Sequence, residues 1–356
     1  MMSKSISNNS LGSQQTLAAK RLDIGALHRY LAHNVIGYKG PLYVEQFNGG
    51  QSNPTFRLTA GDRQYVLRKK PSGELLPSAH AVDREFRVIT ALRESNVPVA
   101  LTHCYCDDDS LIGTPFYVMD FVEGRFFWDP TLRDLNPGDR HAVWDDFNRV
   151  VAALHSVNVS SVGLDDFGRP GNYLERQISR WTKQYRASET EPIEAMNCLI
   201  DWLPENIPPG EEVSIVHGDL RLDNLIFHPS EPRVLAVLDW ELSTLGHPLA
   251  DLSYHMLTWR LTAEQFRGMG GADLSSLGIP SEAEYLKRYC DRVGRATINS
   301  SDWEFYLTFS MFRLAAILQG IAKRADLGTA SSPHAVETGR RARPIAEAAW
   351  QQVLRL

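Results

Sequence analysis

Three polar side chains in the second half of the chain have the types and spacing to act together on a hydroxyl group and a metal ion. Asp219 precedes Asn224 by five residues, and Asp239 ends the apolar run that follows. A carboxylate can accept or orient the proton of a hydroxyl group, and carboxylate and amide oxygens are ligands that Mg²⁺ accepts. In the kinase catalytic loop one aspartate orients the hydroxyl group, and an asparagine and a second aspartate bind the metal ion. The pattern predicts Asp219 as the catalytic residue and Asn224 and Asp239 as metal ligands.

Aspartate and asparagine are also frequent in turns, so any one of these residues alone would indicate a turn rather than a catalyst. Here two short apolar runs, 224–227 and 234–238, accompany the motif and are separated by His228-Pro229-Ser230. A hairpin formed by these runs would carry Asp239 back beside the loop. The three residues together with this hairpin favour phosphoryl transfer.

The elements that must position the motif change character along the chain. In the first third of the chain, aromatic and apolar residues alternate with polar ones between turn residues, which predicts an antiparallel meander interrupted by one helix. The expected strands are 43–47, 56–59, 65–68 and 116–121, and the expected helix is 81–94. Later segments are mostly helical in period, at 140–157, 173–185 and 194–203. Capping boxes at Ser281-x-x-Glu284 and Ser301-x-x-Glu304 predict two further helices, the second of them long. The predicted fold class is α+β, an N-terminal antiparallel sheet with one main helix and a mainly helical C-terminal lobe.

The length of 356 residues exceeds what one compact core usually holds, which predicts two lobes. We place the N-lobe at residues 22–119 and the C-lobe at 120–356. Residues 1–21 are predicted to be a disordered tail, because the first part is rich in Ser, Asn and Gln and lacks the apolar stretch of a secretory signal.

Composition excludes several classes of partner. A net charge of −6 gives no global basic field for nucleic acid, and apolar runs are far shorter than a membrane-spanning helix needs. The four cysteines have neither zinc-site spacing nor a disulfide framework, so free thiols in a reducing cytoplasm are expected. No obligate protein partner is indicated. The expected partner is a small molecule.

The motif His217-Gly218-Asp219, followed by Asn224, resembles the signature loop of the aminoglycoside phosphotransferase family. Segments 66–71, 75–80 and 83–88 look like the phosphotransferase domain fused to certain acyl-CoA dehydrogenases, although we expect no dehydrogenase domain within this chain. The resemblance spans about residue 22 to the C-terminus. It implies a protein-kinase-like two-lobe fold, with ATP and Mg²⁺ as cofactors.

The resemblance also implies a set of nucleotide-binding residues. The loop that covers the nucleotide would contain Gly49, Gly50, Ser52 and Asn53, although Asn-Gly between strands is equally a hairpin signal. Arg68 stands where the family usually has a lysine, and Lys70 could take that role from the same strand face. Glu85 would form an ion pair with Arg68. The backbone of the hinge, at Met119, Asp120 and Val122, would hold adenine.

The remaining candidates have supporting roles or define the acceptor. His155 and His217 are expected to be structural, and Asp251 to fix a loop. A protein kinase is disfavoured because only eleven residues separate Asp239 from Asp251, which leaves little room for an activation segment. A pseudokinase is disfavoured because all three motif residues are present.

The resemblance to the dehydrogenase-fused domains implies a hydroxyacyl thioester of coenzyme A, or a similar acidic metabolite, as the acceptor. The alternative is an aminoglycoside or another amine or sugar. A basic C-terminal group could receive the phosphates of coenzyme A; it consists of Lys323, Arg324, Arg340, Arg341 and Arg343. Aromatic residues on late helices are available as walls of the acceptor site, although such residues are more often core: Trp259, Tyr285, Trp303 and Phe312.

Overall fold

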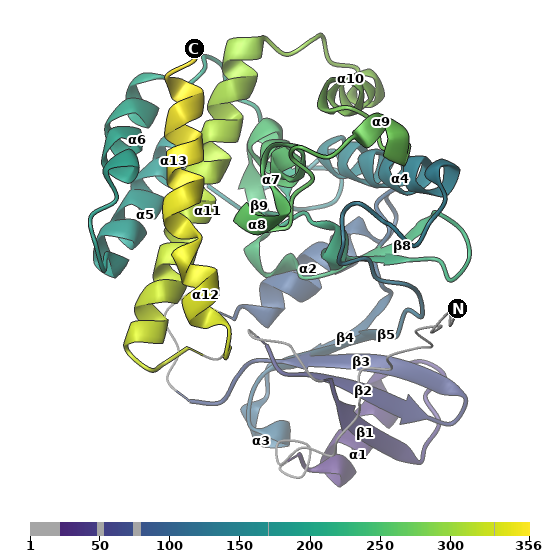
Figure 1. Cartoon of the computed structure of the whole chain (residues 1–356). Coiled ribbons are helices and arrows are strands. Elements are labelled where there is room, and N and C mark those ends of the chain that lie inside the picture. The colour runs from purple at the N-terminus through teal and green to yellow at the C-terminus, as the bar shows by residue number, and fades with distance from the viewer. Residues whose placement is uncertain (1–21, 48–52, 74–79, 170, 331) are drawn as a thin grey trace, which may run out of the picture. The chain divides into compact units, whose positions relative to one another are not determined.

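The computed structural model describes residues 22–47, 53–73, 80–169, 171–330 and 332–356, which form two compact units (Figure 1). The first unit contains the chain up to Glu94 and Val99–Glu123, and the second contains Ser95–Pro98 and Gly124–Leu356. The first unit ends four residues after the expected boundary at 119, because the sheet continues: the Phe121 amide donates to the Gln64 carbonyl at 3.2 Å. The expected tail, residues 1–21, lies outside the described residues.

The first unit is built on a five-stranded antiparallel sheet with the strand order β1-β2-β3-β5-β4. The strands are β1 (Leu42–Gln46), β2 (Thr55–Ala60), β3 (Arg63–Lys69), β4 (Thr102–Cys106) and β5 (Phe116–Asp120). Three helices accompany the sheet: α1 (Ile24–Asn34), α2 (Val82–Leu92) and α3 (Asp109–Ile112). The predicted strands and helix are present, and α1, α3 and β4 are additions to them.

Alternation along β2 explains why one face of this sheet forms a core. Phe56, Leu58 and Ala60 are buried while the residues between them are partly exposed, which is the period of a half-buried strand. The core also takes in Leu27 and Leu31, the two buried residues of α1. The fold of this unit therefore follows from the alternation that the sequence displays.

The second unit is mainly helical. Its helices are α4 (Pro137–His155), α5 (Tyr173–Ser188), α6 (Glu194–Glu205), α7 (Pro248–Arg260), α8 (Ala263–Phe266), α9 (Leu274–Leu277), α10 (Glu282–Val293), α11 (Ser300–Asp326), α12 (Ala335–Arg340) and α13 (Ala342–Val353). Two antiparallel strand pairs lie among them, β6 (Ser214–Val216) with β9 (Thr244–Gly246) and β7 (Leu225–Phe227) with β8 (Val234–Val237). The predicted hairpin is β7–β8, and the β6–β9 pair is additional.

Helix α11 is the central element of this unit and packs against α5, α7, α12 and α13 (Figure 1). It is long and apolar enough to cross a membrane by length and composition, but 83% of its most apolar window is buried inside the protein. Its predicted start was wrong: Asn299 caps the helix by accepting from the Ser301 amide. The other predicted capping box, Ser281 with Glu284, is present at the start of α10.

Candidate functional site

The buried carboxylate of Glu85, on α2, contacts three other side chains of the first unit. Its Oε2 lies 2.8 Å from Nε of Arg68 and accepts from the Tyr117 hydroxyl at 3.1 Å, and its Oε1 accepts from the Asn53 amide at 2.7 Å. Glu85 is 1% exposed. Because a buried carboxylate is stable only when it is paired and hydrogen-bonded, this cluster fixes the position of the Arg68 guanidinium. The expected ion pair is present.

The two candidate cations lie at the end of β3, with Arg68 inside the strand and Lys70 directly after its last residue. The Lys70 amide donates to the Pro115 carbonyl at 3.0 Å, and its carbonyl accepts from the Thr114 hydroxyl at 2.8 Å. Lys69 is buried, donates to the Ile112 carbonyl, and has its pKa lowered by burial. Arg68 is the cation that the Glu85 cluster positions.

The other expected nucleotide-binding residues are only partly described. Gly49, Gly50 and Ser52 lie outside the described residues, and the Asn53 side chain is buried against Glu85 rather than directed at solvent.

At the expected hinge, Met119 is buried and the Asp120 carboxylate contacts His103 Nε2 at 2.7 Å. The Asp120 amide donates to the Leu101 carbonyl at 2.8 Å, so this amide is engaged within the first unit. Within the described part of the chain, no backbone partner is recorded for Val122.

The catalytic-loop residues meet in the second unit, just after β6. The side-chain nitrogen Nδ2 of Asn224 donates to the backbone carbonyl of Asp219 at 2.8 Å and to Oδ2 of the Asp219 carboxylate at 3.1 Å. The Leu238 backbone amide donates to the Asn224 backbone carbonyl at 2.8 Å. Asp239 is the next residue after Leu238, so this bond brings it close to Asn224. Asp239 has a left-handed backbone, with φ of 65°. The predicted residues Asp219, Asn224 and Asp239 are therefore brought together.

The carboxylate of Asp251, on α7, holds the start of the loop. It accepts from the backbone amides of His217 and Gly218, each at 2.8 Å, and from His155 Nε2 at 3.2 Å. Burial alone would raise the pKa of Asp251, but His155 and His217 outweigh it and hold this pKa below its usual range. The expectation that Asp251 fixes a loop is confirmed.

Two further contacts define the conformation of the loop. His217 Nε2 donates to the Leu238 carbonyl at 2.8 Å, and its Nδ1 accepts from the Asp219 amide at 3.2 Å, so both ring nitrogens are engaged in holding the loop. Gly218 has φ of 84°, and a Cβ there would lie 2.9 Å from the Leu242 carbonyl oxygen. Only glycine fits this position without strain, which gives a physical reason for the glycine between His217 and Asp219.

Arg313, on α11, contacts the loop, and the sequence did not reveal this contact. Its guanidinium donates to the Gly218 carbonyl and lies 4.5 Å from the ring centroid of Tyr254. Burial raises the pKa of the Asp219 carboxyl, while Arg221, His217 and Arg313 oppose that rise. Arg313 is separated from Asp219 by 94 positions in the sequence, so no local pattern could have identified it.

The donor set fits a magnesium ion that is shared with phosphate groups. The Asn224 amide nitrogen is occupied within the loop, so its oxygen is the atom that could face a cation. Over the described residues there is no group of three or more His, Cys, Asp or Glu side chains able to hold a metal. One amide and one carboxylate are consistent with Mg²⁺, which usually keeps waters and substrate phosphates as its other ligands.

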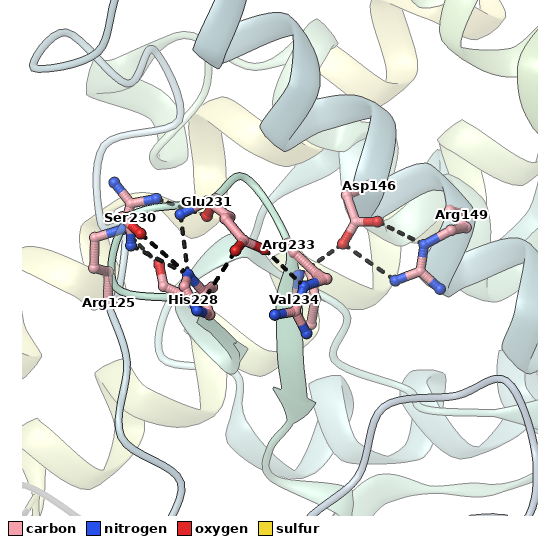
Figure 2. Close-up of polar contacts among 8 residues, drawn as sticks. All are labelled: Arg125, Asp146, Arg149, His228, Ser230, Glu231, Arg233 and Val234. Carbon is pink, nitrogen blue, oxygen red and sulfur yellow. Dashed lines mark hydrogen bonds and ion pairs between the residues drawn. The ribbon is translucent and has the colours of Figure 1, made fainter.

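The β7–β8 hairpin that links Asn224 to Asp239 is anchored at both sides of its turn, as Figure 2 shows. Arg125 donates through Nε to the His228 carbonyl at 2.9 Å and through Nη2 to the Glu231 carbonyl at 2.8 Å. On the other side, Asp146 of α4 accepts from the Val234 amide at 2.7 Å. A Cβ on Gly124 would lie 2.2 Å from the Phe227 carbonyl oxygen, so this glycine permits the close approach.

The expected acceptor residues are placed differently. The four aromatic candidates are core rather than walls, with exposures of 6% or less: Trp259, Tyr285, Trp303 and Phe312. Trp128, which lines a pocket together with Arg221, is an exposed aromatic side chain, at 67%. In the basic C-terminal group, Arg341 is paired with Glu337 and Arg343 with Glu191, so these two charges are largely neutralised.

Comparison with known proteins agrees with this geometry. Residues 44–286 match the model of the phosphotransferase enzyme family. The chain is 49% identical to acyl-CoA dehydrogenase family member 10 of Mus musculus, covering 91% of this chain and 30% of that protein. It is 42% identical to acyl-CoA dehydrogenase family member 11 of Homo sapiens, covering 95% and 44%. The chain thus spans less than half the length of these curated relatives.

Solved structures show the same fold. A candidate aminoglycoside phosphotransferase from Ralstonia eutropha jmp134 is 53% identical and superposes with a TM-score of 0.87, over 94% of this chain and 98% of that one. The aminoglycoside phosphotransferase APH(4)-Ia, solved with ADP and hygromycin B, is 16% identical with a TM-score of 0.59, over 91% and 98%. The chain belongs to the phosphotransferase enzyme family and has its protein-kinase-like fold.

Proposed function

We propose that this protein transfers the γ-phosphoryl group of ATP, with Mg²⁺, to a hydroxyl group of a small molecule. The observation that carries the proposal is the contact between Asp219 and Asn224 in a loop clamped by Asp251. Side chains held in this way can orient a hydroxyl group for in-line attack. Such positioning is a large part of a protein's contribution to phosphoryl transfer.

In this reaction the acceptor oxygen forms a bond to the γ-phosphorus while the bond to the β–γ bridging oxygen breaks and ADP leaves. Asp219 orients the hydroxyl and takes its proton, which then passes to solvent. The raised pKa of Asp219, caused by burial, suits a group that accepts a proton. Mg²⁺, held by Asn224 and Asp239, would neutralise charge on the phosphates.

In the first unit, the role of Arg68 is to meet phosphate oxygens. Its Nε pairs with Glu85, which fixes the guanidinium, and a planar guanidinium matches the geometry of phosphate oxygens. Arg68 thus replaces the lysine expected from the family.

For the acceptor, we propose a hydroxyacyl thioester of coenzyme A, on the strength of the similarity to acyl-CoA dehydrogenase family members 10 and 11. The alternative is an amine or sugar acceptor, since APH(4)-Ia is solved with hygromycin B and another phosphotransferase with spectinomycin. This proposal does not require the basic C-terminal group to bind the phosphates of coenzyme A.

The test is a screen of ATP consumption over hydroxyacyl thioesters, amino sugars, simple amines and sugars, followed by identification of the phosphorylated product. We expect ATP consumption with one class of hydroxylated compound, in an amount equal to the phosphorylated product formed and only when Mg²⁺ is present. The proposal fails if nucleotide binds and no hydroxyl acceptor of any class is phosphorylated.

A further inference from the structure

The Glu85 carboxylate, in the first unit, is held at both of its oxygens. Arg68 and Tyr117 lie opposite each other in the register of β3 and β5, so their side chains point to the same face of the sheet. Both contact Oε2 of Glu85, Arg68 through Nε at 2.8 Å and Tyr117 through its hydroxyl at 3.1 Å. The other oxygen, Oε1, accepts from Nδ2 of Asn53 at 2.7 Å.

A further hydrogen bond extends this group to His80, which lies just before α2. Nδ1 of His80 is 3.0 Å from Oδ1 of Asn53. Nδ2 of Asn53 donates to Glu85, and Oδ1 of the same amide can only accept, so Nδ1 of His80 carries the proton and donates. Two hydrogen bonds therefore run in one direction, from His80 through Asn53 to Oε1 of Glu85.

The backbone holds Asn53 and His80 in place. His80 has φ of 60°, a left-handed conformation that is uncommon for residues other than glycine. Such a conformation costs free energy and persists where the surrounding contacts determine it. Asn53 is 2% exposed, and the Thr55 hydroxyl donates to its carbonyl at 3.0 Å. The fold itself thus sets the direction from which Asn53 meets the carboxylate.

An arginine at position 68 depends on the orientation of this carboxylate more than a lysine would. The last torsion of a glutamate side chain is broad, so a carboxylate held at one oxygen can still rotate. A lysine ammonium is a point charge with rotatable donors and tolerates that rotation, whereas a guanidinium is planar and has its donors in a fixed fork. The direction in which the Arg68 guanidinium faces therefore follows the plane of the Glu85 carboxylate, which Asn53 fixes through Oε1.

We propose that Asn53 and His80 are positioning residues for Arg68, and that they orient the Glu85 carboxylate so that the guanidinium meets the phosphates of ATP. Asn53 then acts through Glu85 rather than by contact with the nucleotide. The arginine at position 68 and the two hydrogen bonds are parts of one arrangement. This inference rests on the proposed function and extends its phosphate-binding part to two further residues.

The experiment is a double-mutant cycle between Asn53→Leu and Arg68→Lys, with the affinities for ATP and for adenosine measured by calorimetry in the presence of Mg²⁺. Leucine has a similar size to asparagine and makes no hydrogen bonds. Asn53→Leu is expected to weaken ATP binding about 10-fold. Adenosine binding should change less than about 2-fold, because adenosine has no phosphate for Arg68 to meet. In the Arg68→Lys background, Asn53→Leu should weaken ATP binding less than about 2-fold, because an ammonium does not depend on the carboxylate plane.

Variants of His80 provide a second test at a half-buried position. His80→Asn keeps an N–H donor close to the position of Nδ1 and tolerates the left-handed backbone, so its ATP affinity should stay within about 2-fold of wild type. His80→Gly removes the donor without backbone strain and should weaken ATP binding about 5-fold, with adenosine binding unchanged. Asn34→Leu is the matched control, since this exposed asparagine of α1 donates to the Tyr30 carbonyl at 2.9 Å. It should leave both affinities unchanged.

Equal losses of ATP and adenosine affinity in Asn53→Leu would overturn the inference, because the role of Asn53 would then be structural. The same conclusion follows if Asn53→Leu weakens ATP binding as much in the Arg68→Lys background as in the wild type, or if the two His80 variants bind ATP equally. The proposed function would survive these results if the wild-type protein phosphorylates a hydroxyl compound. Conversely, ATP-specific coupling between Asn53 and Arg68 without phosphorylation of any acceptor would support the inference and refute the proposed function.

Discussion

The Nε atom of Arg68 lies 2.8 Å from the carboxylate of Glu85, which is 1% exposed, inside the first unit. Removing one partner of a buried pair leaves the other charge uncompensated, which costs about 3–5 kcal/mol. We therefore expect Arg68→Met to lower the free energy of unfolding by about that amount and to weaken ATP binding. Urea unfolding and nucleotide calorimetry measure the two effects.

The same unit supplies a control for this prediction. Arg57 and Glu45 form an ion pair in which both side chains are more than 30% exposed, and exposed pairs contribute only about 0–1 kcal/mol. Arg57→Met should leave nucleotide affinity unchanged and barely alter stability. Equal destabilisation by the two variants would mean that burial of Glu85 does not determine the strength of its pair.

Asp219→Asn should abolish most turnover and retain ATP binding. The amide keeps the size of the side chain but can no longer take the acceptor proton, and loss of a general base typically lowers kcat by about 10²–10⁴-fold. Steady-state kinetics and calorimetry on the same preparation test this expectation. Asp201→Asn, at an exposed position of α6, is the control for a loss of one negative charge. Wild-type turnover in Asp219→Asn would contradict the assignment.

Asp239→Asn should weaken Mg²⁺-dependent nucleotide binding by more than about 10-fold, because the carboxylate is replaced by a neutral ligand. Asparagine is the appropriate replacement because it tolerates the left-handed backbone at this position, whereas alanine would add strain. Calorimetric titration of ATP at several Mg²⁺ concentrations provides the measurement. If the Mg²⁺ dependence is the same as in the wild-type protein, the metal lies elsewhere.

Asp251→Asn should destabilise the protein by about 1–3 kcal/mol at neutral pH, because the amide cannot accept equally well from the two backbone amides of the loop. The pKa of Asp251 is lower in the folded protein than its usual value. Such a group stabilises the fold above its unfolded-state pKa, and this contribution is lost as the pH falls through the folded-state pKa.

The difference in unfolding free energy between wild type and Asp251→Asn should therefore be constant above about pH 5 and should shrink as the pH falls below about 4. Urea unfolding at neutral and acidic pH tests this dependence. A difference that grows on acidification would show that the wild-type carboxyl is protonated in the folded state.

Much of the fold and the core of the site could be predicted because the signals are local. The alternation of β2 and β3 and the spacing of Asp219 and Asn224 lie within short segments, and the structure agrees with both. The predicted start of α11 failed for a local reason as well. Asn299 precedes the Ser301 motif by two residues and takes the capping role itself.

The support of the loop could not be predicted in the same way. Arg313 contacts Gly218 from a helix 95 positions away, and the strands β6 and β9 have three residues each, too short to display a period. Such contacts depend on tertiary packing rather than on sequence spacing.

The segment Ser95–Pro98 belongs to the second unit although the chain on both sides of it belongs to the first. The Val237 amide, on the strand that leads to Asp239, donates to the Pro98 carbonyl at 2.9 Å. A C-terminal piece that starts at Gly124 would lack this acceptor near Asp239, the proposed metal ligand. Dissection of the protein into separately expressed halves would therefore need the segment Ser95–Pro98 to be supplied to the C-terminal piece, for example by circular permutation.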